Sequence, residues 1–225
     1  MKSNMPVTRR NFLRASAVTL VTATLATSPR LSRSARAQSS NSDLDILNYA
    51  LTLEHLESRA YQSVNTIGLL TGRTREIFVD FGDQEAAHVV ALTGTITQLG
   101  GAPVRAQESY NWPTFQNAQE VLTYFQILEE LGAAAYLGQA PRLQNPELLT
   151  AAVAIHNVEG QHAAILSDLI GLPPAPAFAP AKTMEEVLTV ITPILMPTGT
   201  MPSAMPNTGL GGGRQQWRYQ REQPQ

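Results

Sequence analysis

The chain has 225 residues, with 16 Lys and Arg against 18 Asp and Glu, and it contains no cysteine. The absence of thiols excludes disulfides, thiolate-held zinc, iron–sulfur clusters and cysteine nucleophiles, so a metal ion here needs oxygen and imidazole ligands. Seven of the basic residues and none of the acidic ones fall in residues 1–37, which leaves nine basic and 18 acidic residues in the rest. That acidic balance argues against nucleic-acid binding, because phosphate contacts need concentrated positive charge.

Residues 1–37 have a pattern typical of an export signal. A twin-arginine pair stands at residues 9–10, an apolar run covers residues 15–27, and small residues flank an arginine at 35–37. The apolar run is too short to span a bilayer comfortably. We expect cleavage after Ala37, export by the twin-arginine route to the periplasm or another exported location, and no stable membrane span afterwards. An uncleaved anchor and a cytoplasmic protein with a chance arginine pair are the alternatives.

Residues 42–170 favour helices. Apolar residues recur there at three- and four-residue spacing among Ala, Leu, Glu and Gln, and strand signals are almost absent. The predicted helices run from about Ser42 to Thr71, Thr74 to Leu99, Thr114 to Ala140, and Asn145 to Ile170.

Capping residues mark several of these ends. Ser42 can cap the first helix, with Asp43 and Asp45 near the positive end of its dipole. Glycines at 100–101 close the second helix. Pro146 opens the fourth at a position where a missing N–H costs nothing.

The connections predict the topology. Only a few residues join the first helix to the second and the third to the fourth, so each pair is antiparallel. The roughly 14 residues from 100 to 113 can extend about 45 Å, enough to run the length of helices of about 25 residues. We therefore predict an all-α, antiparallel four-helix bundle over residues 42–170, with one long crossover between helices two and three.

The composition changes after residue 170. Residues 171–195 combine a Pro-rich linker with a short amphipathic helix, predicted from Lys182 to Leu195. Residues 196–225 are rich in Pro, Gly and Gln, which predicts a disordered or loosely docked tail.

Two Glu-x-x-His motifs carry the chemistry, Glu85-x-x-His88 in the second helix and Glu159-x-x-His162 in the fourth. Residues three apart on a helix project from nearly the same side, so each motif offers a carboxylate and an imidazole to one point. A dinuclear carboxylate site in a bundle needs two such pairs and one glutamate from each remaining helix. Glu54 and Glu129 supply these glutamates.

The two halves of this set repeat each other. The spacing is 75 residues from Glu54 to Glu129, and 74 from Glu85 to Glu159 and from His88 to His162. A tyrosine also follows each unpaired glutamate by seven residues, Tyr61 in one half and Tyr136 in the other, which keeps it on the same helix face. We expect both tyrosines to hydrogen-bond to site carboxylates and fix their orientation.

Charge balance favours a filled site. Unpaired carboxylates inside a bundle cost several kcal/mol each, whereas two divalent cations neutralise four of them. We expect two metal ions, iron ahead of manganese. The alternative is that all six are ordinary surface residues.

Three further polar residues lie near the predicted ligands. Glu57 and Glu130 could each substitute as a ligand, but we assign Glu57 to the outer shell and Glu130 to solvent. His156, one turn before Glu159, is either an outer-shell neighbour of the site or a structural histidine.

These motifs resemble the ferritin-like domain of the desiccation-related and stress-response family, a branch of the ferritin and rubrerythrin superfamily. The resemblance covers about residues 43–170 and is carried by residues 53–57 with Tyr61, 83–88, 128–132 with 135–138, and 158–163. It implies a ferritin-like bundle with Glu54 and Glu129 as terminal ligands, Glu85 and Glu159 as bridging ligands, and one histidine per ion. The Pro- and Gln-rich tail departs from a minimal bundle, and the lack of cysteine leaves no rubredoxin-like module.

Two functions follow from this reading. The first is a redox protein for stress protection, either an iron oxidase or a protein that reduces peroxide or dioxygen at two metal ions. The second is a non-enzymatic metal-binding stress or desiccation protein that acts through structural or partner interactions. Iron storage would need a specific hollow shell, for which the sequence offers no sign, and a homodimer is one possible assembly.

Overall fold

The structure is a computed structural model that describes residues 31–195, with side chains from residue 42 onward. This range contains five α-helices, one short 3-10 helix and no strand. The elements are α2 (Leu31–Val64), α3 (Gly72–Gln98), α4 (Ala118–Gln139), η1 (Ala140–Arg142), α5 (Pro146–Leu169) and α6 (Met184–Leu195). The twin-arginine pair, the apolar run that follows it and the tail at 196–225 lie outside the described residues.

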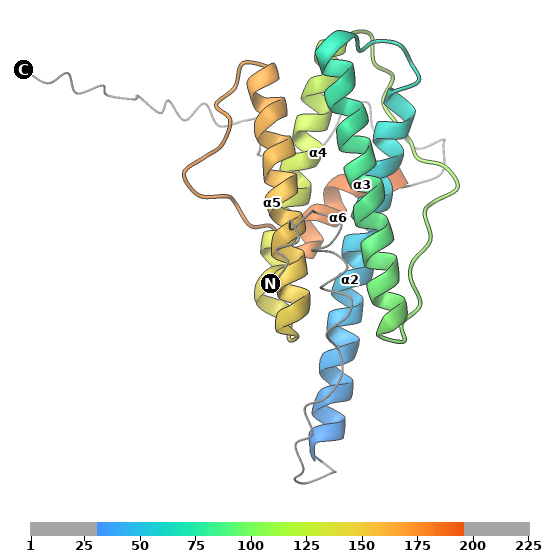
Figure 1. The fold of residues 1–225 in the computed structure, drawn as a ribbon, viewed down its shortest axis with the longest axis vertical. Coiled ribbons are helices and arrows are strands. Elements are labelled where there is room, and N and C mark those ends of the chain that lie inside the picture. The colour runs from blue at the N-terminus through green and yellow to red at the C-terminus, as the bar shows by residue number, and fades with distance from the viewer. Residues whose placement is uncertain (1–30, 196–225) are drawn as a thin grey trace, which may run out of the picture.

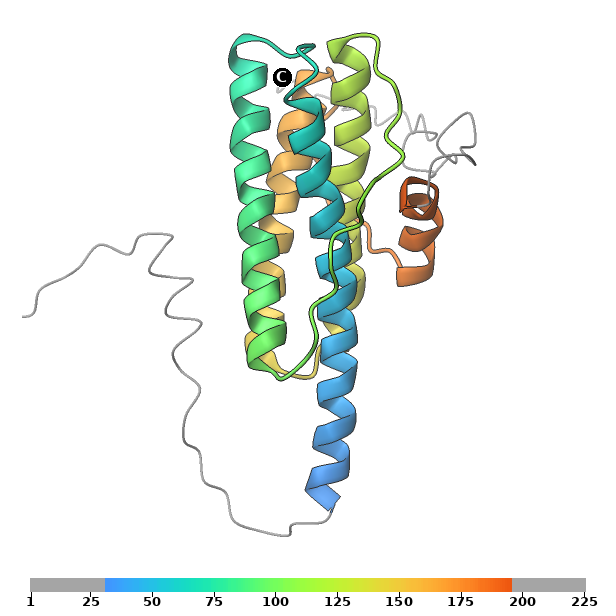
Figure 2. The same ribbon diagram turned by 90° about the vertical axis from the view of Figure 1, so that its right-hand side faces the viewer.

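Helices α2 to α5 form the predicted antiparallel bundle (Figures 1 and 2). The most extensive helix pairings are α2 with α3 and α4 with α5. The connection between α3 and α4 runs the length of the bundle, as the sequence predicted. Within the described part of the chain, no helix is both long enough and apolar enough to cross a membrane.

Two helices end in the same glycine motif. After α3, Gly100 has φ 78° and the Gly101 N–H donates to the Ile96 carbonyl at 2.9 Å. After α5, Gly171 has φ 75° and the Leu172 N–H donates to the Ser167 carbonyl at 2.8 Å. A left-handed residue at this position lets the chain turn back and satisfy the last carbonyls, and glycine adopts it without strain.

The predicted start of the first helix is wrong. Helix α2 begins at Leu31 rather than Ser42, because residues 31–41 contain no glycine or proline to stop it. Ser42 is therefore no cap, and the predicted cut after Ala37 falls within the helix. Asp43 instead accepts the backbone N–H groups of Gln144 at 2.9 Å and Asn145 at 3.1 Å, which ties α2 to the connection between α4 and α5.

Other helix boundaries shift by a few residues. Helix α2 ends at Val64, before Gly68 with φ 75°, and not near Thr71. Helix α4 begins after Asn117, whose side chain accepts the Glu120 N–H, and not at Thr114. Helix α5 begins at Pro146, as predicted, and Asn145 caps it through the Glu147 N–H.

Helix α6 packs outside the four-helix bundle against α4. Thr183 and Glu186 form a reciprocal capping box, in which the Glu186 N–H donates to the Thr183 hydroxyl at 3.2 Å and the Thr183 N–H to Glu186 Oε2 at 2.7 Å. The segment before it lies against Gly138, where an added Cβ would be 1.8 Å from the Lys182 carbonyl oxygen. Glycine at 138 is therefore what allows this close approach.

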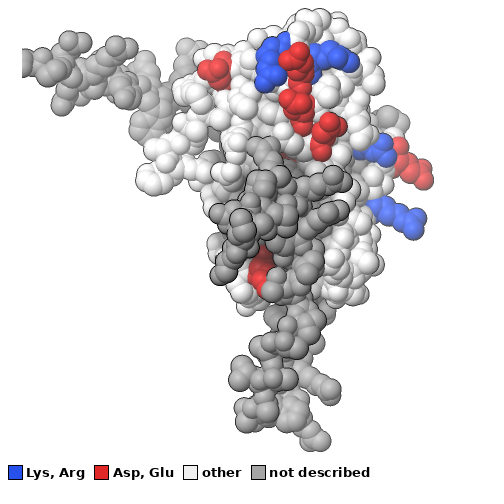
Figure 3. Space-filling view, in the orientation of Figure 1, with Lys and Arg blue, Asp and Glu red and all other residues white. Residues whose placement is uncertain are grey.

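Acidic and basic side chains are mixed on the face seen in Figure 3, where they gather toward the upper end of the bundle. Most of the rest of the described surface on that face carries no charge. The strongest concentration of carboxylates lies instead inside the bundle.

Candidate metal centre

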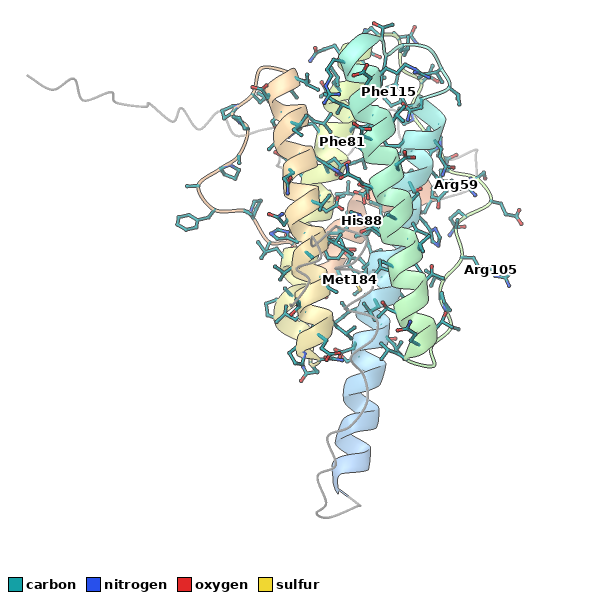
Figure 4. All side chains as sticks on the ribbon, in the orientation of Figure 1. Arg59, Phe81, His88, Arg105, Phe115 and Met184 are labelled. Atoms are coloured by element: carbon teal, nitrogen blue, oxygen red, sulfur yellow. The ribbon has the colours of Figure 1, made fainter. Side chains whose placement is uncertain are left out.

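The six residues predicted as ligands come together at one level of the bundle. Glu54 lies on α2, Glu129 on α4, and the two Glu-x-x-His motifs on α3 and α5. All four carboxylates are fully buried. Figure 4 labels His88 near the middle of the bundle's length, below Phe81 on the same helix.

Their potential ligand atoms form two overlapping groups. One contains Glu54, Glu85, His88 and Glu159, and the other contains Glu85, Glu129, Glu159 and His162. Within each group the ligand atoms lie within 4.8 Å of one another. The groups share Glu85 and Glu159 and have one histidine each, which is the arrangement that two adjacent ions require.

Each imidazole faces more acceptors than it can serve. His88 Nδ1 lies 3.1 Å from Glu54 Oε2, 3.1 Å from Glu85 Oε2 and 3.2 Å from Glu159 Oε1. His162 Nδ1 lies 2.9 Å from Glu85 Oε1 and 3.1 Å from Glu129 Oε2. A ring nitrogen carries at most one hydrogen, so hydrogen bonding alone does not satisfy these oxygens.

Several of these carboxylate oxygens lack a hydrogen bond. Glu85 Oε1 and both oxygens of Glu159 are buried without one, although ring nitrogens lie within 3.2 Å of two of them. Buried carboxylate oxygens without partners are costly, and cations satisfy them without needing hydrogen-bond angles. With oxygen and imidazole donors only, the set fits two ions of the iron or manganese type.

Gln84 sets the tautomer of one histidine, a role that the sequence analysis missed. The Nε2–H of His162 donates to Gln84 Oε1 at 3.0 Å. A neutral ring with its hydrogen on Nε2 presents a lone pair at Nδ1, which faces the carboxylates. Phe81 stacks on this ring with centroids 3.9 Å apart, so the orientation of His162 is held from two directions.

Burial and close charges shift the proton affinities of the cluster. Burial raises the pKa of Glu54 to about 7 and that of Glu159 well above its ordinary value. Burial also acts to raise the pKa of Glu85, but the close imidazoles of His162 and His88 outweigh it and hold this pKa at about 2. Burial opposes protonation of His162, yet Glu129 and Glu85 raise its pKa to about 9. The metal-free cluster thus holds protons where cations would bind.

Both predicted tyrosines hydrogen-bond to the site, but crosswise. The Tyr61 hydroxyl donates to Glu129 and the Tyr136 hydroxyl to Glu54. Each tyrosine therefore orients the glutamate of the other half of the repeat rather than the one on its own helix. Burial raises the pKa of both phenols well above the ordinary value, so they remain donors.

Glu57 is a fifth buried carboxylate beside the cluster. It is 4% exposed, and its Oε2 has no hydrogen bond. Gly132 makes room for it, because an added Cβ would lie 2.8 Å from Glu57 Oε1 and 3.3 Å from Glu159 Oε2. Burial, followed by repulsion from Glu159, raises the pKa of Glu57 well above its ordinary value.

Two other predicted neighbours lie outside this arrangement. The Nδ1 of His156 is 3.0 Å from the Ala133 carbonyl oxygen, so its N–H donates to α4 backbone and ties α5 to α4. Glu130 is partly exposed, and burial raises its pKa against the opposing effect of Gln126. Of the two roles considered for His156, this contact favours that of a structural histidine.

Residues 42–172, more than half of the chain, match the family described as ferritin-like domain. The chain belongs to the ferritin-like domain family. The match covers α3, α4, α5, the part of α2 from residue 42 onward, and all six residues of the two groups of ligand atoms. No curated protein sequence matches this ferritin-like chain.

Two solved structures are similar to this ferritin-like chain. A conserved hypothetical protein from Mycobacterium tuberculosis has 18% sequence identity and a TM-score of 0.55, and the match covers 63% of this chain and 99% of that one. A protein described as ferritin-like, diiron-carboxylate, from Bacillus anthracis str. Ames has 20% identity and a TM-score of 0.48, with coverage of 59% and 98%. The first comparison supports the fold and nothing finer.

Proposed function

We propose that this ferritin-like protein binds two metal ions at the two groups and uses them in a redox reaction with a small oxidant, dioxygen or peroxide. Glu54 and Glu129 would be terminal ligands, Glu85 and Glu159 bridging ligands, and His88 and His162 one nitrogen ligand each. The observation that carries the proposal is the pair of overlapping groups whose shared carboxylates, Glu85 and Glu159, have oxygens without hydrogen bonds.

Two bound ions of iron or manganese would supply the electrons for such a reaction, and we propose iron ahead of manganese. The chain's own residues do the positioning. Tyr61 and Tyr136 hold the carboxylates of Glu129 and Glu54 by hydrogen bonds. Gln84 keeps the hydrogen of His162 on Nε2, which leaves Nδ1 free to bind a cation.

Metal analysis of the purified protein is the first test. We expect two iron or manganese ions per chain, and their loss when Glu85 and Glu159 are both changed to Ala. Glu108→Ala serves as a matched control, because Glu108 is exposed in the crossover. A double variant that keeps both ions would overturn the ligand assignment.

Turnover is the second test. We expect the wild-type protein to oxidise added Fe(II) with dioxygen, or to consume peroxide, and the Glu85→Ala/Glu159→Ala protein to do neither. Two bound ions without metal-dependent turnover would favour the alternative, a metal-binding stress or desiccation protein that works through structural or partner interactions.

We also propose that the protein belongs to the desiccation-related and stress-response branch and is exported by the twin-arginine route to the periplasm. The pattern at residues 9–10, 15–27 and 35–37 supports export, and the motifs at residues 53–57, 83–88, 128–132 and 158–163 support the branch. Replacing both arginines by lysine should retain the protein in the cytoplasm, as fractionation would detect. Unchanged export of that variant would count against the route.

A further inference from the structure

An apolar cavity of about 60 Å³ adjoins the two groups. It lies toward the end of the bundle where α3 ends and α5 begins, and all four bundle helices contribute to its wall. Nearly all of the wall is carbon, much of it from alanine side chains. Because packed interiors contain few voids of this size, a cavity beside buried carboxylates calls for an explanation.

The cavity lies on the Glu54 and His88 side of the centre and is separated from it by Tyr136. Tyr136 lines it and donates its hydroxyl to Glu54, whose other oxygen lies 3.1 Å from His88 Nδ1. Ala91, one helical turn after His88, also lines the cavity. A molecule in this space therefore lies one side chain away from the first group.

The internal repeat explains why the space exists. Tyr61, Phe78, Phe81 and Phe125 pack as an aromatic cluster on the other side of the centre, with ring centroids of interacting pairs 4.6–6.1 Å apart. The repeat spacing of 74 or 75 residues pairs Phe78 with Ala152, Phe81 with Ile155, and Phe125 with Ala50. All three smaller residues line the cavity. One side of the centre is thus filled by aromatic rings, and the equivalent space on the other side is not.

The two histidines of the centre, His162 and His88, differ in the same way. His162 is covered by Phe81 and bonded to Gln84, and its side chain is 2% exposed. His88 is 12% exposed, and the repeat places Val158, which has no acceptor, where Gln84 would correspond. The His88 side is therefore the accessible side of the centre.

The wall selects for an apolar molecule. The Thr95 hydroxyl is bonded to the Ala91 carbonyl at 2.9 Å, and the Tyr136 hydroxyl to Glu54. Of the three lining hydroxyls, only that of Tyr49 has no hydrogen bond, so the hydroxyls of the wall offer a guest one free partner. Peroxide, with two O–H donors, would lose most of its hydrogen bonds with water on entering such a space, whereas dioxygen has none to lose.

The lining residues that solvent reaches lie on α3 and α5. Ala151 is exposed, and Ala91, Thr95, Ala152 and Ile155 are partly exposed, although all five line the cavity. Three of these five residues are alanines, so few large side chains separate the cavity from solvent here.

We propose that this cavity binds a small, uncharged, apolar molecule of the size of dioxygen and delivers it to the His88 side of the centre. This inference rests on the proposed redox function and chooses the apolar oxidant over the polar one. An engineered apolar cavity of about 150 Å³ in another protein binds benzene or xenon. The smaller volume here fits a ligand of a few atoms.

Xenon is the probe for occupancy. We expect metal-free crystals under xenon pressure to show a xenon atom between Tyr136 and Ala152. We expect Ala152→Phe, which places a ring where Phe78 stands on the filled side of the centre, to abolish it. Ala154→Phe, on the exposed face of α5, is the matched control and should keep the xenon atom. If Ala152→Phe does not fold, Ile155→Phe makes the same test. No xenon in the wild type, or xenon retained in the filled variant, would overturn the site.

Reactivity is the probe for delivery. We expect Ala152→Phe to retain both metal ions, to react with dioxygen several-fold more slowly than wild type, and to react with hydrogen peroxide at an unchanged rate. If the variant reacts equally slowly with both oxidants, or at the wild-type rate with both, selective delivery of dioxygen is contradicted. Xenon uptake is measured on the metal-free protein. The occupancy test can therefore be interpreted even if the protein proves not to bind two metal ions.

Discussion

Changing Glu159 to Gln should stabilise the metal-free protein while destroying its metal site. Both oxygens of Glu159 are buried without a hydrogen bond, and burial, followed by repulsion from Glu85, raises its pKa well above its ordinary value. Glutamine has nearly the same shape and no charge. In the metal-free protein the substitution therefore removes a cost, and in the metal-bound protein it removes a ligand.

The size of this gain can be bounded. The ordinary pKa of the group is 4.5. If the carboxyl stays protonated in the folded protein, the free energy of unfolding falls by about 1.4 kcal/mol for each pH unit from 4.5 to 7. The maximum gain for Glu159→Gln at pH 7 is thus about 3 kcal/mol, or up to about 10 °C in Tm for a domain of this size. A raised pKa penalises the folded state only above the unfolded pKa, so the gain should shrink as the pH falls toward 4.5.

Thermal unfolding followed by circular dichroism measures this gain. The samples are wild type, Glu159→Gln and the exposed control Glu108→Gln, each with chelator and with added Fe(II) or Mn(II) under nitrogen. We expect Glu159→Gln to unfold at the highest temperature with chelator and at a lower temperature than wild type with metal. A lower Tm for Glu159→Gln with chelator at pH 7, or an equal gain at pH 7 and 4.5, would refute the reasoning.

Three further substitutions test other parts of the structure. Gln84→Leu removes the acceptor for His162 Nε2–H and should weaken metal binding by about 10–100-fold in a competition titration, with the fold unchanged. Asp43→Ala leaves two backbone N–H groups at the start of α5 without their acceptor, and should lower the free energy of unfolding by about 1–3 kcal/mol in a denaturant titration. Gly138→Ala should push the linker away from α4 and release α6, which faster tryptic cleavage after Lys182 would report.

Each of these three predictions can be contradicted by a specific result. Unchanged metal affinity in Gln84→Leu would mean that the tautomer of His162 is set by another group. An unchanged midpoint in Asp43→Ala would mean that water replaces its contacts at no cost. Gly160→Ala, with nothing within 4 Å of the added carbon, is the control for Gly138→Ala and should cleave at the wild-type rate.

The bundle and its central cluster follow from local patterns, which explains why both could be predicted. The helical period and the turn residues predict the four helices, and the three-residue spacing within each Glu-x-x-His motif fixes which face it occupies. With short turns and helices of similar length, an antiparallel bundle brings Glu54 and Glu129 to about the level of the motifs, and the structure places their carboxylates in the two groups.

Features that depend on tertiary neighbours could not be predicted in the same way. Gln84 has no spacing that marks it, because its partner His162 is 78 residues away on another helix. Asp43 looked like a helix dipole residue from its position near Ser42, but its acceptor role is defined by backbone about 100 residues later. The start of α2 was misplaced because a capping residue such as Ser42 also fits inside a helix when nothing before it stops the helix.

The crossed tyrosines have a consequence for symmetry. Tyr61 on α2 orients Glu129 on α4, and Tyr136 on α4 orients Glu54 on α2, so neither helical hairpin contains a finished half of the centre. Two copies of one hairpin related by a two-fold axis would make the same contacts between separate chains. The centre therefore has the geometry of an isologous dimer interface within one polypeptide. The aromatic rings lie on one side only, and they make the two sides of the centre different.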